Sequence, residues 1–352
     1  MVNKFGLIAL LGSGETSAAG GLIFETLARR LESQLRIGIL ETPAGFELNT
    51  HRVARRVAEY LSTRLNNYDP HIRLIPARKR NTAFSPDDPD ICAGIVSSNL
   101  IFFGPGSPTY AVRQLQGSLA WDYIQARHRL GGFIALASAA TIALGEKALP
   151  VYEIYKVGED PHWKDGLNFF GPFGLSLVIV PHWNNFEGGS EVDTSRCFVG
   201  RQRFEILASQ LDRGTTILGL DEHTGLIIDL NSETCQVLGK GEIHLIGEGR
   251  ERSFGNDVTF SIRNLGQFHV LEDLWEGIDP ANWQKALDVD RINAEFLFDP
   301  LPPVEVMELL ELRRQARYLQ NWGKSDELRL RISGMGWMVV DTPDGQKLQK
   351  TS

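Results

Sequence analysis

The side chain with the strongest local signature for covalent chemistry is Ser138, which directly follows the apolar run GFIALA. Two small residues, Ala139 and Ala140, come next, in a segment that we expect to become helical. A strand-to-helix turn at a serine lifts its hydroxyl out of the sheet onto the positive end of the helix, where the next backbone amide can stabilise an oxyanion. The alternative is that Ser138 only caps the helix. We interpret Ser138 as a candidate nucleophile and the amide of Ala139 as an oxyanion donor.

Three other segments supply the groups that a serine nucleophile needs. Gly106 lies in FFGPGSPTY after another apolar run, and we expect its amide to be the second oxyanion donor. His182 follows the run LSLVIV and a proline, so its imidazole is a candidate base at the edge of a sheet. Glu153 lies between Ser138 and His182 in the chain and is the candidate to orient the imidazole. A lone histidine at a strand end is more often structural, so the prediction depends on the combination.

Short apolar runs alternate with amphipathic stretches over the first 150 residues. The runs that we predict to be strands are residues 5–11, 36–41, 72–77, 99–104 and 132–137. Apolar strands separated by helices form parallel sheets covered on both faces, so we predict an α/β fold with a mostly parallel sheet flanked by helices. Further on we expect strands with tight turns at 177–180, 216–220, 226–230 and 236–238. Such a sheet places its chemistry at the carboxyl ends of its strands.

Four more polar residues are candidates to bind substrate. Glu15 and Glu41 follow the first two predicted strands, so both should face the same crevice. There they would bind a substrate ammonium, or only cap the following helices. Glu222 and His223 lie in LGLDEHTG between two predicted strands. They would line the pocket, anchor a turn or, for Glu222, act as the acidic partner of the histidine in place of Glu153.

The succession of these motifs resembles a known family. The order strand–GPGSP–helix, strand–SAA–helix, then EIYKVG and PHWNN is similar to the serine peptidase family of aspartyl dipeptidase and cyanophycinase, which has the three-layer, flavodoxin-like class I glutamine amidotransferase fold. The resemblance implies Ser138 as nucleophile, His182 as base and Glu153 as the acidic member of the triad. It also implies that the amides of Gly106 and Ala139 hold the oxyanion. It implies a homodimer and no metal or organic cofactor.

The resemblance also implies a substrate class. The family acts on aspartyl dipeptides and on the aspartate–arginine polymer cyanophycin, so we predict cleavage of a peptide or amide bond in a small acidic peptide. A cation must then hold a carboxylate, and Arg196, Arg201 and Lys156 are candidates, or parts of a solvated face. The elbow has Leu136 and Ala140 where the family has glycines, and a sharp elbow tolerates little bulk. The alternative is therefore a catalytically inactive binding protein with the same fold.

The C-terminal segment carries a separate resemblance. A Pro-rich break near Asp299 precedes EVMELLELRRQARYLQNWGKSDELRLRISGMGWMVVDTPDGQK, which is similar to the extreme C-terminal end of cysteinyl-tRNA synthetase. We predict a main domain at 1–270, a linker at 271–300 and a helical hairpin module at 301–352. The chain has no HIGH or KMSKS motif, so adenylate chemistry is not expected. The module would pack on the main domain, mediate dimerisation, or bind tRNA or another RNA.

Composition and charge exclude several classes of protein. The 352 residues are 42% hydrophobic and 23% charged, which is typical of a globular protein with a core and excludes intrinsic disorder. A net charge of −8 argues against a general nucleic-acid-binding surface. No apolar run approaches the roughly 20 residues that span a bilayer, and we interpret the N-terminal FGLIALL as a buried strand rather than a signal peptide. With three widely spaced cysteines, which offer no metal framework, we expect a cytoplasmic protein without membrane contact.

Overall fold

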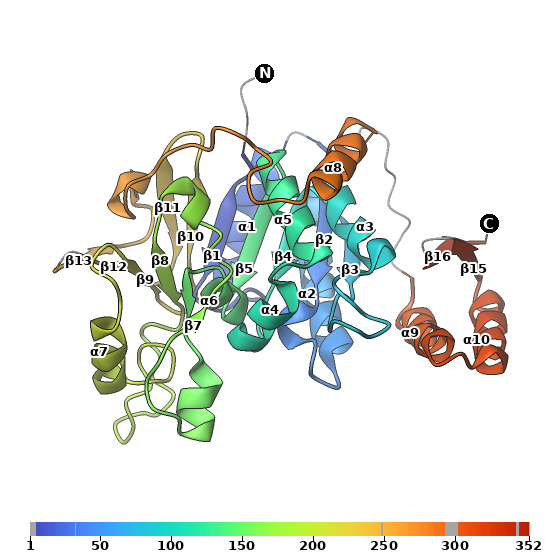
Figure 1. Ribbon diagram of the computed structural model, residues 1–352, viewed down its shortest axis with the longest axis horizontal. Coiled ribbons are helices and arrows are strands. Elements are labelled where there is room, and N and C mark those ends of the chain that lie inside the picture. The colour runs from blue at the N-terminus through green and yellow to red at the C-terminus, as the bar shows by residue number, and fades with distance from the viewer. Residues whose placement is uncertain (1–4, 32, 248, 293–301, 343–344, 352) are drawn as a thin grey trace.

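The centre of the protein is an eight-stranded sheet in the order β14-β11-β10-β1-β5-β4-β2-β3 (Figure 1). The computed structural model describes residues 5–31, 33–247, 249–292, 302–342 and 345–351. Five neighbouring strands are parallel: β1 (Ile8–Leu11), β5 (Phe133–Ala137), β4 (Leu100–Phe103), β2 (Arg36–Leu40) and β3 (His71–Ile75). Three antiparallel strands extend the sheet beyond β1: β10 (Thr224–Asp229), β11 (Thr234–Gly239) and β14 (Thr259–Ser261). The α/β fold with a mostly parallel sheet is therefore confirmed.

Helices cover both faces of this sheet, and alternate residues of its strands divide between two hydrophobic cores. On one face lie α1 (Ala18–Arg30) and α2 (Thr50–Arg64). On the other face lie α3 (Pro89–Ser97), α4 (Pro108–Leu115), α5 (Leu119–Arg129) and α6 (Ala139–Ala143). In β5, for example, Ala135 and Ala137 belong to the first core, and Ile134 and Leu136 to the second. Because both faces are buried, the strands read in sequence as unbroken apolar runs.

A second sheet has six strands in the order β13-β12-β9-β8-β6-β7. Its strands are β6 (Lys147–Ala148), β7 (Lys164–Asp165), β8 (Leu177–Val180), β9 (Thr216–Leu220), β12 (Ile243–Gly247) and β13 (Arg250–Phe254), and helix α7 (Arg201–Ser209) connects β8 to β9. The strands expected at 177–180 and 216–220 are confirmed. Strands β8 and β9 pair in parallel, so their carboxyl ends lie next to each other.

The segment 271–300, which the sequence predicts to be a linker, contains part of the main domain. Helix α8 (Pro280–Ile292) lies beside α3 and α5 (Figure 1), and Ile278 is buried in the second core. Arg127 of α5 forms an ion pair with Asp290. The linker prediction is wrong for these residues. The segment is mostly polar, and the few apolar side chains that anchor the helix do not form a clear pattern in the sequence. Residues 293–300 of the segment lie outside the described residues.

The C-terminal module is a helical hairpin followed by a β-hairpin. Its elements are α9 (Val304–Tyr318), α10 (Trp322–Gly334), β15 (Trp337–Thr342) and β16 (Gly345–Lys350). They enclose a small core of their own, with buried Val306, Leu309, Leu328, Ile332 and Trp337. The predicted helical hairpin is therefore confirmed. Among the helices in the described ranges, none is long and apolar enough to cross a membrane.

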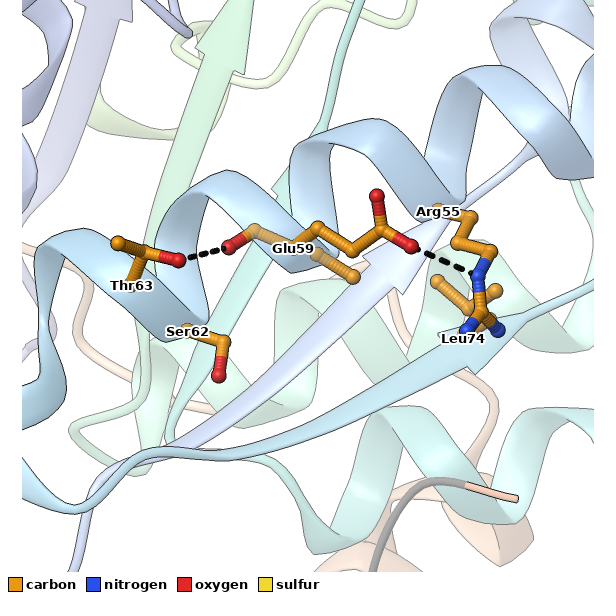
Figure 2. Close-up of a pocket in the computed structure, with 6 residues that line it drawn as sticks. Arg55, Glu59, Ser62, Thr63 and Leu74 are labelled. Atoms are coloured by element: carbon orange, nitrogen blue, oxygen red, sulfur yellow. Dashed lines mark hydrogen bonds and ion pairs between the residues drawn. The ribbon is translucent and has the colours of Figure 1, made fainter. Parts of the chain in front are cut away.

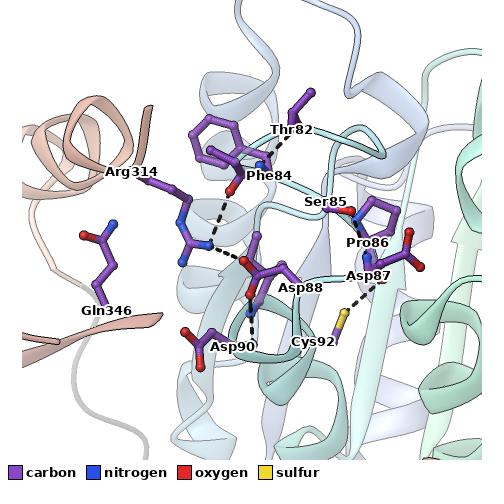
Figure 3. Close-up of polar contacts among 12 residues, drawn as sticks. Thr82, Phe84, Ser85, Pro86, Asp87, Asp88, Asp90, Cys92, Arg314 and Gln346 are labelled. Atoms are coloured by element: carbon purple, nitrogen blue, oxygen red, sulfur yellow. Dashed lines mark hydrogen bonds and ion pairs between the residues drawn. The ribbon is translucent and has the colours of Figure 1, made fainter. Parts of the chain in front are cut away.

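The module packs on the main domain next to β3 and α3 (Figure 1). Arg314 of α9 donates hydrogen bonds to the carbonyl of Ala83 and, at 2.9 Å, to the carboxylate of Asp88, which also caps α3 (Figure 3). Arg78 donates to both carboxylate oxygens of Glu311, at 3.1 and 2.6 Å. Packing on the main domain is one of the roles that the sequence predicts for this segment, and two arginine–carboxylate pairs form part of the contact.

A buried histidine lies in the core on the α5 side of the sheet. His128 is fully buried, and within the described residues neither of its ring nitrogens has a hydrogen-bond partner. Its ring stacks on Phe5 and meets Phe169 and Phe173 edge-on. Burial lowers the pKa of His128 from 6.5 to about 3, because a charged imidazole would lose its hydration in this core.

We expect His128 to make the fold sensitive to acid. Between pH 6.5 and about 3 only the unfolded chain binds the proton, so the free energy of unfolding falls as the pH falls. At pH 5 the loss from this group is on the order of 2 kcal/mol. His128→Leu should remove that part of the pH dependence, measured as the difference in urea unfolding free energy between pH 7 and pH 5. An unchanged difference in the variant would contradict the assignment, and His162→Leu is the control at a more exposed histidine.

Candidate active site

The candidate nucleophile lies on a strained turn at the end of β5. Ser138 has φ 53° and ψ −114°, a backbone conformation that non-glycine residues rarely adopt, and α6 begins at the next residue. Its amide donates to the carbonyl of Leu11 at the end of β1. Such strain persists only where the surrounding structure enforces it, and it is concentrated at functional sites.

The two bulky positions of the elbow are accommodated by the core. The side chains of Leu136 and Ala140 are completely buried in the core on the α5 side. Leu136 is two residues before Ser138 on the strand and its side chain packs into that core, so its bulk does not prevent the turn. The departure of this sequence from glycine at these positions is therefore compatible with a sharp elbow.

A hydrogen-bonded chain runs from Ser138 through an imidazole to a carboxylate. The Oγ of Ser138 lies 2.9 Å from Nε2 of His182, and Nδ1 of His182 lies 2.7 Å from Oε1 of Glu222. A carboxylate only accepts hydrogen bonds, so Nδ1 carries a proton and Nε2 of the neutral ring is free to accept the serine hydroxyl proton. This is the arrangement of a nucleophile, a general base and an orienting acid.

The strand order explains why these three residues meet. His182 follows β8 and Glu222 follows β9, and the two strands are parallel neighbours. The amide of His182 donates to the carbonyl of Gly12, directly after β1, next to the Leu11 carbonyl that binds the amide of Ser138. A side chain at Gly12 would lie 2.1 Å from the carbonyl oxygen of Asp221, so this junction requires glycine. The end of β1 thus holds the serine and the histidine side by side.

The charge of Glu222 is stabilised in this position. The hydrogen bond from His182 is the main cause that lowers the pKa of Glu222, and a second hydrogen bond from Asn185 acts in the same direction. Its own backbone amide donates to the side chain of Asn184. The carboxylate is therefore ionised and fixed opposite Nδ1 at neutral pH.

Glu153, which the sequence predicts to orient His182, lies elsewhere. It is the first residue of the π-helical turn η3 (Glu153–Val157), and its Oε1 accepts a hydrogen bond from Thr109 at 2.7 Å. Its Oε2 is buried and has no hydrogen-bond partner among the described residues. The carboxylate bonded to His182 is instead that of Glu222. Strand β9, which Glu222 follows, is the parallel neighbour of the strand that His182 follows, and the order of residues along the chain does not reveal this pairing.

The two predicted oxyanion donors line the same cavity as Ser138. Ala139 is the first residue of α6, so its amide has no acceptor within the helix. Gly106 has φ 149°, and a side chain there would lie 2.0 Å from the carbonyl oxygen of Pro43. In the described part of the chain neither amide has a hydrogen-bond acceptor. Both are therefore available to an oxygen bound beside the serine.

The cavity over the triad has a volume of about 270 Å³. Its walls include the aromatic and charged side chains of Tyr152, Tyr155, Lys156, Glu187 and Phe198. Of these, the sequence analysis predicted only Lys156 to bind substrate. The ammonium of Lys156 lies 5.0 Å from the centre of the Tyr155 ring, and Phe198 packs against both Tyr155 and His182. Tyr155 and Lys156 belong to the EIYKVG motif, so this motif of the sequence indicates part of the cavity wall.

The two arginines proposed to bind substrate do not line this cavity. The guanidinium of Arg196 lies 3.8 Å from the centre of the Trp183 ring and donates to the carbonyl of Trp183. Arg201 begins α7, where its amide binds the carboxylate of Asp193. Lys156 is the only Lys or Arg side chain among the residues that line the described cavity. It is therefore the remaining candidate for the predicted cation.

The other predicted substrate-binding residues also lie outside the cavity. Glu41 is buried and forms an ion pair of 2.6 Å with Arg78. Glu15 lies in the turn between β1 and α1 and is not among the residues that line the cavity. The amide of His223 is bound by the side chain of Ser13. Of this group, Glu222 alone contacts His182.

A second hollow, of about 230 Å³, lies between α2 and β3 (Figure 2). Its polar groups are bonded to one another: Arg55 donates to Glu59 at 2.9 Å, and Thr63 donates to the carbonyl of Glu59. None of the predicted site residues lines this hollow. Throughout the described residues, no group of three or more His, Cys, Asp or Glu side chains is arranged to hold a metal ion.

Comparison with solved structures supports the fold. A peptidase from an acI-B1 Actinobacterium has a TM-score of 0.60 and 19% sequence identity, covering 74% of this chain and 98% of that chain. A Listeria monocytogenes EGD-e structure described as a peptidase E protein has a TM-score of 0.45 and 12% identity, covering 67% and 100%. The first likeness shows a shared fold, as the sequence predicts. No family model matches the chain.

Curated proteins match a smaller part of the chain. Cysteine–tRNA ligase of Chlamydia caviae is 29% identical over 130 residues, which are 34% of this chain and 26% of the ligase. The ligase of Protochlamydia amoebophila is 46% identical over 48 residues, or 14% and 10%. The chain thus spans about a quarter or less of the length of these relatives. The predicted resemblance of a short segment to cysteinyl-tRNA synthetase is confirmed.

Two glutamate variants distinguish the acidic partners. Glu222→Gln should lower the rate at which a fluorophosphonate labels Ser138 by about 10²-fold or more. The neutral side-chain amide of glutamine cannot stabilise the charged imidazole of His182 as the carboxylate does. Glu153→Gln, the matched control, should change this rate by less than about threefold. Labelling is measured by the mass increase of the intact protein over time. A larger effect at Glu153 than at Glu222 would overturn the geometry described here.

Proposed function

We propose that this protein is a serine hydrolase that cleaves a peptide or amide bond. The observation that carries the proposal is the chain of hydrogen bonds from Ser138 to His182 and from His182 to Glu222, 2.9 and 2.7 Å long. It lies at the carboxyl ends of strands, where α/β sheets place their ligand sites. The fold neighbour from the acI-B1 Actinobacterium is itself described as a peptidase, which supports the same reaction class.

The geometry suits acyl transfer in two steps. His182 takes the hydroxyl proton as Ser138 Oγ attacks the carbonyl carbon, and the amides of Gly106 and Ala139 receive the developing oxyanion. The imidazolium, stabilised by Glu222, then gives its proton to the leaving amine as the C–N bond breaks. Water, deprotonated by the same imidazole, attacks the acyl-serine, and its proton returns to Oγ as the acid product leaves.

The cavity favours a small, acidic peptide as the substrate. Its volume of about 270 Å³ is just below the usual range for drug-sized ligands, so it holds a small peptide or the end of a longer one. Lys156 offers an ammonium for a substrate carboxylate, and Glu187 offers a carboxylate for a substrate ammonium. A dipeptide carries both charges at its ends, and an acidic side chain adds a second anion for Lys156.

The alternative is a binding protein that has the same fold but no turnover. It would keep its ligand affinity when Ser138 is replaced, whereas a hydrolase loses its reaction. The distance between Ser138 and His182 favours the hydrolase, because a binding protein has no need of an imidazole placed to take the serine proton. Assembly as a homodimer stays a prediction.

A role for the C-terminal module in binding tRNA or another RNA also stays a prediction. The observation in its favour is that Arg317 and Arg329 lie around Asp341 on an exposed surface, with Arg317 over the exposed ring of Trp322. Aromatic and guanidinium groups together are typical of surfaces that stack on unpaired bases. The cysteine–tRNA ligases that match the chain are consistent with this role.

The central experiment compares the wild type and Ser138→Ala on a dipeptide library rich in Asp-X and β-aspartyl members. We expect the wild type to cleave acidic dipeptides and the variant to lose at least about 10³-fold in kcat/KM, because the nucleophile is gone. Far-UV circular dichroism checks that the variant is folded. Lys156→Met should reduce the preference for acidic over uncharged dipeptides without abolishing cleavage.

Cleavage that persists in Ser138→Ala would refute the assignment of the nucleophile. If a dipeptide binds the wild type and the variant equally well and neither cleaves it, the binding alternative is supported instead.

A further inference from the structure

A second chain of polar side chains lies directly behind the triad. In this chain the Oγ of Ser253 lies 2.9 Å from Nδ1 of His244, and Nε2 of His244 lies 3.2 Å from Oδ1 of Asp221. His244 on β12 and Ser253 on β13 are direct cross-strand partners. A neutral ring satisfies both contacts if the serine hydroxyl donates to Nδ1 and Nε2 donates to the carboxylate.

One end of this chain fixes the residue before Glu222. Asp221 is buried, and its Oδ2 accepts a hydrogen bond from the amide of Glu242 at 2.9 Å, while its own amide donates to the Glu242 carbonyl. A side chain at Gly241 would lie 2.6 Å from Asp221, so the two segments are in close contact. His244 supplies the remaining hydrogen bond to the Asp221 carboxylate that the structure records.

The same histidine packs on the residue after His182. The ring of Trp183 is stacked on His244, with ring centres 5.4 Å apart and planes inclined by 23°. Trp183 is only 2% exposed, and its amide donates to the carbonyl of Leu220. A side chain at Gly219 would lie 2.6 Å from the Trp183 ring, so the indole lies directly on β9.

We infer that His244 is a positioning residue for the Glu222–His182 pair. It touches the chain neighbour of each member, Asp221 before the glutamate and Trp183 after the histidine, and so ties together the two loops that the 2.7 Å hydrogen bond joins. Side chains behind a reacting group hold it within the fraction of an ångström that the reaction requires. The consequence for turnover rests on the proposed function, but the consequence for the geometry does not.

The residues Ser253, His244 and Asp221 have the composition of a hydrolytic triad, but their placement is different. Ser253 lies within the regular strand β13, which pairs with β12 from Arg250 to Phe254. No helix begins there, so the strand offers no set of free amides for an oxyanion, in contrast to the turn at Ser138. A positioning role therefore fits this second chain better than catalysis.

The proton between His182 Nδ1 and Glu222 provides the first readout. A proton in such a hydrogen bond gives a downfield ¹H NMR signal, which His182→Ala assigns by its loss. We expect this signal to disappear or broaden by at least about twofold in His244→Ala, and to return in part in His244→Gln, whose side-chain NH₂ can replace Nε2 as donor. His71→Ala, at the amino end of β3, is the matched control and should leave it unchanged. An unchanged signal in a folded His244→Ala protein would overturn the inference.

Turnover provides the second readout. We expect His244→Ala to lower kcat by about 10-fold or more with KM within twofold, and to have little further effect once Glu222→Gln is present, because both changes act on the same imidazole. Equal effects of His244→Ala in both backgrounds would overturn the inference. If the NMR signal responds as expected but the wild type cleaves no peptide, the proposed function fails while the positioning role stands.

Discussion

The hydrogen bond between His182 and Glu222 is the contact on which the geometry of the site depends. It fixes the proton on Nδ1 and turns Nε2 toward Ser138, so the imidazole is in the tautomer that a general base for this serine requires. Parallel pairing of β8 and β9 brings the two residues together, and the end of β1 holds the amides of Ser138 and His182. Two sheets therefore contribute to one site.

The fold and the hydrogen-bonded pair of Ser138 and His182 are predictable from sequence, because the sequence patterns that indicate them are local. Strands buried on both faces read as apolar runs. Ser138 directly follows such a run, and His182 follows another after Pro181. The acidic partner is set by which strands are neighbours. The order of residues along the chain and the family resemblance favour Glu153, but β9 rather than the η3 turn lies next to β8, and Glu222 follows β9.

The direction in which a side chain points decides which of the predicted cations lines the cavity, and the sequence does not give this direction. Arg196 and Lys156 carry the same charge and both lie near motifs of the site, but Arg196 packs on Trp183 whereas Lys156 lines the cavity. Only the packed structure distinguishes them. The helix α8 was missed for a related reason, since a few contacts such as the ion pair of Arg127 with Asp290 anchor a polar segment that reads as a linker.

The measurement that tests the central claim most directly is the mass of the protein quenched in acid during turnover of a dipeptide or its ester. The account predicts an adduct with the mass of the acyl group, and peptide mapping should locate it on Ser138, because the first step transfers the acyl group to this hydroxyl. An acyl adduct on another residue, or rapid cleavage without any adduct when deacylation is the slow step, would contradict the account.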